Sequence, residues 1–270
     1  MRGMFTAGVM DVMMEAGIEF DGAIGVSAGA AFGVNYKSKQ IGRVIRYNMQ
    51  FCNDPRYCGL NSLITTGNIY NTEFAYKIVP LQYHPFDFAA YSKHPMEFVV
   101  VCTDIETGKP VYHTYAGWED HGFDWIRASA SMPLVSQIVE IDGIKMLDGG
   151  ISDPLPLRRF EQQGYNKNVV ILTQPGDYRK RKTSAMLLLK LMYKKYPHLV
   201  HAMKVRHEVY NESVEYINRK EAAGEILVIR PESPLPVSRV EKSPKKLREC
   251  YEIGRAAALQ RLEEIKQFLS

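Results

Sequence analysis

The five residues Gly25-Val26-Ser27-Ala28-Gly29 constrain the fold more than any other stretch of this chain. Residues 20–24 before them can form a strand, and the small apolar residues after them can begin a helix. A tight turn between a strand and a helix holds its central residue in a strained backbone conformation. Because the chain approaches itself closely there, we expect Gly25 and Gly29 to be required for their lack of side chains. The pattern therefore predicts a strand–turn–helix unit with Ser27 as a candidate nucleophile.

Apolar runs and helical patterns alternate along the rest of the chain. Residues 98–103 and 168–173 are continuous apolar runs, which are typical of strands buried on both faces of a parallel sheet. Further elements are predicted from periodicity and turn residues: a helix over 3–15, a strand over 111–115, a hairpin of 138–141 and 144–147 around Asp142-Gly143, a strand over 225–230 and one helix over 245–269. This alternation predicts an α/β fold with a mostly parallel central sheet, formed as a single domain over residues 1–270, with the helical region 180–270 packed on the rest.

Composition excludes several classes of function. The net charge of +4 is too small to indicate a nucleic-acid partner. The four cysteines lack paired spacing, so we expect neither a zinc site nor disulfides, and reduced thiols favour a cytoplasmic protein. No cluster of metal-ligating residues appears, and we expect no metal or other cofactor. No run of about 18 apolar residues indicates a membrane span.

Residues 183–223 predict two helices that are broken near Pro197. Residues 185–192 form the most apolar stretch of the chain, with Arg179-Lys180-Arg181-Lys182 before it and Lys194-Lys195 after it. A basic-flanked apolar helix can make peripheral contact with a lipid surface. The alternative, which we favour from the sequence, is a core helix with solvated ends.

A second candidate site is Leu147-Asp148-Gly149-Gly150, at the end of the predicted hairpin. We expect the two glycines to let the backbone turn away and to leave the Asp148 carboxylate uncovered. Beside Ser27, this carboxylate would accept the hydroxyl proton as a general base, and burial would improve it by raising its pKa. The alternative is a turn without a chemical role.

In combination, these segments resemble the bacterial type of patatin-like phospholipase. The matching stretches occur in the family's order within the first 156 residues, and they are Arg2-Gly3-Met4-Phe5-Thr6-Ala7-Gly8-Val9, Gly25-Val26-Ser27-Ala28-Gly29, Ala128-Ser129-Ala130-Ser131-Met132-Pro133 and Leu147-Asp148-Gly149-Gly150-Ile151-Ser152-Asp153-Pro154-Leu155-Pro156. The resemblance implies a three-layer α/β/α fold and a serine hydrolase that cleaves acyl esters of lipids, as a phospholipase A or a carboxylesterase does. It also implies a Ser27–Asp148 dyad without histidine that works through an acyl-enzyme.

The chain departs from the family pattern at its beginning. The family usually starts with a strand and a G-G-G-x-R-G loop, whereas only Met1-Arg2-Gly3 precedes the first predicted helix here. We therefore expect the N-terminal strand and the glycine-rich oxyanion loop to be truncated. Arg2, Gly3 and Ala28 remain as candidate oxyanion or site-lining residues, chiefly through the amides of Gly3 and Ala28. The alternative function is a catalytically impaired acyl-lipid binding or regulatory protein on the same fold.

Other candidates carry weaker signals. A Ser-His-Asp triad would need a histidine, but none of the seven histidines lies in a motif that marks a catalytic partner. Asp104 follows a buried strand and is a minor candidate, whereas Ser129 and Ser131 are expected to line the site without a chemical role. Residues 22–29 lack the G-x-G-x-x-G and Lys-Ser/Thr features of a phosphate-binding loop.

Overall fold

The strands of the protein form two sheets in a computed structural model that describes all residues 1–270. The larger sheet contains β1 (Gly22–Val26), β2 (Glu97–Asp104), β3 (Pro110–Thr114), β4 (Val139–Ile141) and β5 (Ile144–Asp148). The smaller sheet pairs β6 (Asn168–Ile171) with β7 (Ile226–Ile229). β1 pairs in parallel with β2, and β6 with β7, whereas β3, β4 and β5 add antiparallel pairs. The predicted α/β class is confirmed, and the buried strand predicted over 98–103 is β2. The strand predicted over 168–173 is β6, but its expected burial is wrong, because only Asn168 is buried and the other residues of β6 are partly exposed.

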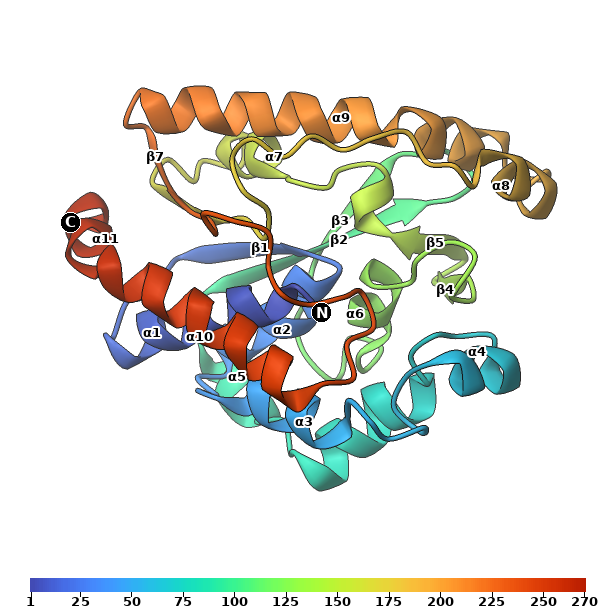
Figure 1. The fold of residues 1–270 in the computed structure, drawn as a ribbon, viewed down its shortest axis with the longest axis horizontal. Coiled ribbons are helices and arrows are strands. Elements are labelled where there is room, and N and C mark those ends of the chain that lie inside the picture. Colours follow the sequence, from blue (N-terminus) through green and yellow to red (C-terminus); the bar gives the residue numbers. More distant parts are fainter.

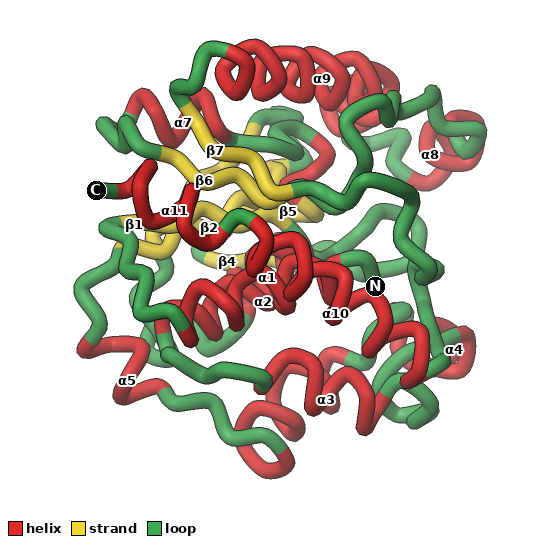
Figure 2. The backbone as a smooth tube through the Cα atoms, turned by 60° about the vertical axis from the view of Figure 1, so that its left-hand side comes forward, coloured by secondary structure: helices red, strands yellow, loops and turns green.

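Helices cover the strands on both sides, which gives the three layers expected of the fold (Figure 1). Helices α7 and α9 lie on one side, and α1, α2 and α10 lie on the other, as Figure 2 also shows. The helices are α1 (Gly3–Glu15), α2 (Ala28–Lys37), α3 (Arg43–Phe51), α4 (Leu60–Thr66), the π-helix η1 (Phe74–Tyr83), α5 (Phe88–Lys93), α6 (Asp124–Ser129), the 3₁₀ turn η2 (Gly149–Ile151), α7 (Leu157–Gln162), α8 (Met186–Met192), α9 (Pro197–Ala222), α10 (Pro244–Gln260) and α11 (Leu262–Leu269). None of them is both long and apolar enough to cross a bilayer.

Strand β2 organises the larger sheet because it pairs along both of its edges. Residues Val99 to Val101 pair with β1 and also with β3, so these two strands lie on opposite edges. β5 pairs with β2 over Cys102 to Asp104, where Cys102 and Thr103 also pair with β3. β5 therefore lies on the same edge as β1 and continues it end to end.

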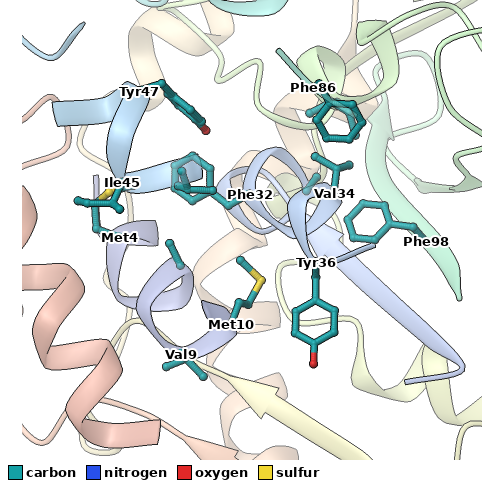
Figure 3. Packing of buried hydrophobic residues seen from close by; sticks show 14 of the residues in the cluster. Met4, Val9, Met10, Phe32, Val34, Tyr36, Ile45, Tyr47, Phe86 and Phe98 are labelled. Carbon is teal, nitrogen blue, oxygen red and sulfur yellow. The ribbon is translucent and has the colours of Figure 1, made fainter. Parts of the chain in front are cut away.

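The hydrophobic core ties the nucleophile-bearing helix α2 to the helices around it. Apolar side chains of α1 and α2 face one another in Figure 3, with Phe98 of β2 beside Val34 and Tyr36. The same core reaches Leu247 of α10 and Ile265 of α11, both fully buried. Burial of this apolar surface supplies the main driving force that holds α2, and with it Ser27, in place.

Helices α1 and α10 cross at unusually close range. A Cβ atom on Gly8 would lie 2.1 Å from the Tyr251 carbonyl oxygen, and one on Gly254 would lie 2.1 Å from the Phe5 carbonyl oxygen. The Tyr251 hydroxyl also donates to the Asp11 carboxylate at 2.6 Å. The C-terminal helical region is thus packed directly against the first helix of the chain.

The predicted hairpin is confirmed, with Asp142 and Gly143 at φ values of 53° and 79°. The single helix predicted over 245–269 is wrong, because the chain leaves the helical conformation at Arg261 (φ −110°, ψ 10°). There the guanidinium of Arg261 donates to the Val228 carbonyl and pairs with Glu264.

The two helices predicted within 183–223 are confirmed as α8 and α9, but the core position of the first is wrong. Only Leu189 of α8 is buried, whereas Leu187, Leu188, Leu191 and Met192 are exposed. Apolar composition alone did not reveal that α8 lies at the periphery, where one side of the helix has no protein neighbour.

Candidate active site

Ser27 occupies a strained turn between β1 and α2. Its φ of 55° and ψ of −117° lie outside the regions that L-residues normally adopt. A Cβ on Gly25 would lie 2.6 Å from the Gly29 carbonyl oxygen, which explains the need for glycine at position 25. The same expectation for Gly29 is wrong, because a Cβ there would meet no atom within 4 Å. The turn brings the Gly29 peptide group against Gly25, while the side-chain direction of Gly29 faces open space.

Strand register brings Asp148 to Ser27 across 121 positions of sequence. Val26, the last residue of β1, pairs with Val101, and Asp148, the last residue of β5, pairs with the next residue, Cys102. Since β1 runs parallel to β2 and β5 runs antiparallel to it, the carboxyl ends of β1 and β5 meet on one edge. The Ser27 Oγ donates a hydrogen bond to the Asp148 Oδ2 at 2.7 Å. This is the distance that proton transfer from a hydroxyl to a base requires.

The Asp148 carboxylate is buried, with 3 % of the residue exposed, so the expectation of an uncovered carboxylate is wrong. Its Oδ1 accepts a hydrogen bond from the Gly150 amide at 2.7 Å, which leaves Oδ2 for Ser27. Gly149 lies tightly on β2, because a Cβ there would lie 2.1 Å from the Val101 carbonyl oxygen. Burial raises the pKa of Asp148, although the bond from Ser27 and the charge of Arg206 act in the opposite direction. The outcome is a carboxylate with more affinity for a proton than an exposed aspartate has.

Two serines that precede the hairpin fix the backbone of the site. The Ser27 amide donates to the Ser129 Oγ at 2.9 Å, and the Ser129 hydroxyl donates to the Val101 carbonyl at 2.6 Å. The Asp148 amide donates to the Ser131 carbonyl at 2.8 Å. Both serines therefore lie beside the site, as expected, and Ser129 has a positioning contact that the sequence did not predict.

Two cations near Asp148 were not predicted from the sequence. The Arg206 Nε of α9 donates to the Gly150 carbonyl at 2.5 Å, and neither Arg206 nor Lys180 forms an ion pair with a carboxylate. Burial, together with the nearby charges of Arg206 and Arg2, lowers the pKa of Lys180 to about 7. The sequence indicates only that this region is strongly basic, since residues 178–207 contain nine lysines and arginines and no aspartate or glutamate.

Two of the candidate oxyanion residues, Gly3 and Ala28, are the first residues of α1 and α2. Gly3 begins α1, and a Cβ on it would lie 3.0 Å from the Ala28 Cβ and 2.5 Å from Phe32 Cε2, so α1 packs directly on α2 at this point. Neither the Gly3 nor the Ala28 amide donates to any acceptor within the protein. Amides at the start of a helix lack intrahelical partners and attract negative charge. Arg2 is an exposed residue that precedes α1.

The remaining candidates lie apart from the Ser27–Asp148 contact. Asp104 accepts hydrogen bonds from the Glu106 amide and the Thr107 hydroxyl, and so stabilises the turn after β2. His113 stacks on Trp125 with ring centroids 3.8 Å apart. No histidine forms a hydrogen bond with Ser27 or Asp148. No group of three or more His, Cys, Asp or Glu side chains is arranged to hold a metal ion.

Comparison with protein families gives two matches. The family model for patatin-like phospholipase matches residues 1–160, which include Ser27 and Asp148. The model for a domain of unknown function (DUF6363) matches residues 196–270, which include α9, α10 and α11.

Curated bacterial proteins are also similar in sequence to this chain. The uncharacterised protein YjjU of Escherichia coli (strain K12) is 26% identical over 268 residues, which cover 94% of this chain and 72% of that protein. The uncharacterised NTE family protein Rv1063c of Mycobacterium tuberculosis (strain ATCC 25618 / H37Rv) is 28% identical over 156 residues, and its Mycobacterium bovis counterpart Mb1092c matches equally. That alignment covers 58% of this chain but 41% of the mycobacterial proteins.

Proposed function

The chain belongs to the patatin-like phospholipase family, and from this premise we propose that it hydrolyses acyl esters of lipids with Ser27 as nucleophile and Asp148 as general base. The observation that carries the proposal is the 2.7 Å hydrogen bond from the Ser27 Oγ to the Asp148 Oδ2, made by a serine in a strained turn. No histidine is needed to connect the two groups.

In the first half-reaction, the Ser27 Oγ attacks the ester carbonyl carbon while its proton moves to the Asp148 Oδ2. The raised pKa of Asp148 favours this transfer because a carboxylate that is partly stripped of water holds a proton more strongly. The tetrahedral intermediate then collapses, and the leaving alcohol takes the proton from Asp148. Ser27 remains as an acyl ester.

The negative charge of the tetrahedral intermediate needs hydrogen-bond donors. The Ala28 amide, directly after the nucleophile, and the Gly3 amide are the candidates, since neither has an acceptor within the protein. The start of α2 adds its helix dipole at the same point. Loss of one such donor typically lowers turnover about 100-fold or more.

In the second half-reaction, water attacks the acyl-enzyme. Asp148 takes a proton from that water and returns one to the Ser27 Oγ, so that the free acid leaves and the dyad is restored. The Gly150 amide keeps Asp148 oriented throughout by bonding to the oxygen that Ser27 does not use.

The substrate class is a phospholipid or a simpler carboxylic ester. Arg206 adds positive charge beside Asp148 without an ion-pair partner, and Lys180, whose pKa is lowered to about 7, is partly protonated near neutral pH; this charge favours a phosphate-bearing lipid over a neutral ester. We also propose a cytoplasmic location with peripheral membrane contact, supported by four buried free cysteines and by the lipid substrate of the proposed reaction.

The experiment is ester hydrolysis by the purified full chain, combined with labelling by a fluorophosphonate probe. Turnover of a short p-nitrophenyl ester is expected for the native chain and is expected to vanish in Ser27→Ala and to fall at least about 1,000-fold in Asp148→Asn. Ser233→Ala, at an exposed serine, is the matched control and should retain both turnover and labelling. Turnover that survives in Ser27→Ala would reject the mechanism.

A catalytically impaired acyl-lipid binding or regulatory protein is the alternative function. Under it, the chain would bind fatty acyl ligands without turnover, and neither property would change in Ser27→Ala. Turnover that depends on Ser27 excludes this alternative.

A further inference from the structure

Helix α8 carries a continuous apolar surface that no part of the protein covers. Leu187 is 83% exposed and Leu191 is 70% exposed, and their neighbours Leu188 and Met192 are also exposed. At 3.6 residues per turn, these four positions occupy one side of the helix. Isolated exposed leucines are common on protein surfaces, but four on one helical face form a patch that calls for a partner.

The opposite side of α8 fixes the helix to the protein. Leu189 and Tyr193 are buried in a cluster with Leu147 and Ile151, the neighbours of the Asp148-Gly149-Gly150 segment. The Tyr193 hydroxyl also accepts a hydrogen bond from the Leu134 amide at 3.2 Å. This packing fixes the orientation of α8, with its apolar face exposed, and connects the helix to the residues on either side of the Asp148-Gly149-Gly150 segment.

The charge around α8 has a single sign. Residues 178–207 contain nine lysines and arginines and no acidic residue. Six of these basic residues are exposed immediately before, within or after α8, namely Arg179, Arg181, Lys182, Lys190, Lys194 and Lys195. None of the six forms an ion pair within the protein. The patch is thus apolar at its centre and positive at its rim.

Helix α8 lies at the periphery of the molecule, on the side away from the C-terminus (Figures 1 and 2). α4 lies on that same side in both views, and its Leu60 and Ile64 are likewise strongly exposed. Neither the sheet nor α10 lies outside α8 in these views, and the exposure of Leu187 and Leu191 shows that its apolar side chains are accessible.

We propose that α8 docks the protein on an anionic lipid surface, with Leu187, Leu188, Leu191 and Met192 inserted among the acyl chains and the basic rim on the phosphate groups. A helix with one apolar face and flanking cations binds at such an interface through both contributions. A second copy of the chain is a poorer occupant, because two such faces in contact would bring like charges together. Docking would bring the proposed hydrolase to its lipid substrate, and this role of α8 rests on the proposed function.

The test is flotation of the full chain with vesicles, carried out on the Ser27→Ala variant so that no lipid is consumed. Binding is expected to vesicles that mix phosphatidylcholine with phosphatidylglycerol, to weaken as salt is raised, and to be much weaker for phosphatidylcholine alone. Leu187→Ser with Leu191→Ser should lower the partition coefficient at least about tenfold. The matched control is Leu259→Ser, at an exposed leucine near the C-terminal end of α10.

The basic rim is tested separately. Replacement of Lys190, Lys194 and Lys195 by Gln should lower binding to anionic vesicles about fivefold per lysine. Lys245→Gln with Lys246→Gln, at two exposed lysines of α10, is the control for loss of positive charge elsewhere and should change binding little. With Ser27 restored, the α8 variants should still hydrolyse a soluble p-nitrophenyl ester like the native chain, so a failure of docking is distinguishable from a failure of the active site.

Two outcomes would overturn the proposal. One is vesicle binding that stays unchanged in the Leu187→Ser, Leu191→Ser double variant. The other is an absence of vesicle binding together with a dimer that this double variant dissociates, which would assign the α8 face to a second copy. Thermal unfolding of each leucine or lysine variant should match that of the Ser27→Ala chain from which it is made, because every leucine and lysine substituted is exposed.

Discussion

The Ser27 amide donates a hydrogen bond to the Ser129 Oγ at 2.9 Å, and Ser129 in turn donates to the Val101 carbonyl of β2. One buried hydroxyl thus connects the strained turn to the central strand of the sheet. The same strand pairs with β5, which ends at Asp148, so both members of the proposed dyad are fixed to β2. The geometry of the dyad depends on this connection as well as on the glycine-containing turn.

Ser129→Ala should therefore weaken both the fold and the proposed reaction. The substitution leaves the Ser27 amide and the Val101 carbonyl without partners, which costs about 1–3 kcal/mol of stability. It should also lower kcat more than it raises KM, because Ser27 loses its fixed position. Ser131→Ala is the control, since its hydroxyl bonds only to the Arg127 carbonyl, and it should retain kcat. Chemical denaturation and ester hydrolysis measure the two effects, and equal kcat values in both variants would contradict the role of Ser129.

The two glycines of the turn should respond differently to substitution. Gly25→Ala forces a Cβ against the backbone of Gly29, and we expect a loss of about 1–3 kcal/mol or more, since backbone cannot shift as a side chain can. Gly29→Ala meets open space in the first turn of α2, and the free energy of unfolding should stay the same or rise by up to about 1 kcal/mol. Equal destabilisation by both substitutions, measured by denaturant unfolding, would contradict the geometry of the turn.

The pH dependence of ester hydrolysis should reflect the burial of Asp148. Only the ionised carboxylate accepts the Ser27 proton, so kcat/KM should rise with pH along an acid limb. Because burial raises the pKa of Asp148, the midpoint of that limb should lie above the usual range for aspartate. Hydrolysis of a soluble ester across the acidic and neutral range measures this midpoint. A limb within the ordinary range of an exposed aspartate would show that a different group controls the reaction.

The lowered pKa of Lys180 predicts how the stability of the protein changes with pH. Its pKa is lowered to about 7 in the folded protein, so the unfolded chain binds more protons between that pH and the ordinary pKa of lysine, about 10.4. The free energy of unfolding therefore decreases as the pH is lowered through that range, because the folded protein keeps Lys180 neutral while the unfolded chain protonates it. Below about pH 7 this decrease is complete. Lys180→Met should stabilise the protein more at pH 6 than at pH 10. Lys204→Met, at an exposed lysine of α9, should show no such difference in denaturant midpoints.

Much of this arrangement could be predicted from the sequence because the deciding signals are local. The hairpin follows from Asp142-Gly143, and the turn at Ser27 follows from small residues between a strand and a helix. The contact of Ser27 with Asp148 was reached through the order of motifs, since no local pattern contains the register that places Val26 and Asp148 opposite adjacent residues of β2.

The features that were missed depend on long-range packing. Arg206 reaches Gly150 from α9, and nothing around Arg206 in the sequence marks that contact. The exposure of α8 was not predicted because the composition of an apolar helix does not show whether the rest of the protein covers it. The break between α10 and α11 lies at Arg261, whose guanidinium bonds to the Val228 carbonyl of β7, and the sequence around Arg261 does not indicate that contact.

The crossing of α1 and α10 tests the proposal that residues 1–160 and 196–270 fold as one domain. Gly254→Ala would place a Cβ 2.1 Å from the Phe5 carbonyl oxygen, so the helices must separate and the shared core must open. We expect a loss of about 1–3 kcal/mol or more in a single transition that is seen equally by far-UV circular dichroism and by fluorescence of Trp118 and Trp125. The control is Gly224→Ser, at another glycine of the C-terminal region, where no atom lies near the Cβ position. This substitution should lower the free energy of unfolding less, and only because a serine is strained at the positive φ of 71°. If Gly254→Ala instead unfolds the C-terminal helices while the tryptophan signal keeps its native midpoint, the two regions are separate folding units.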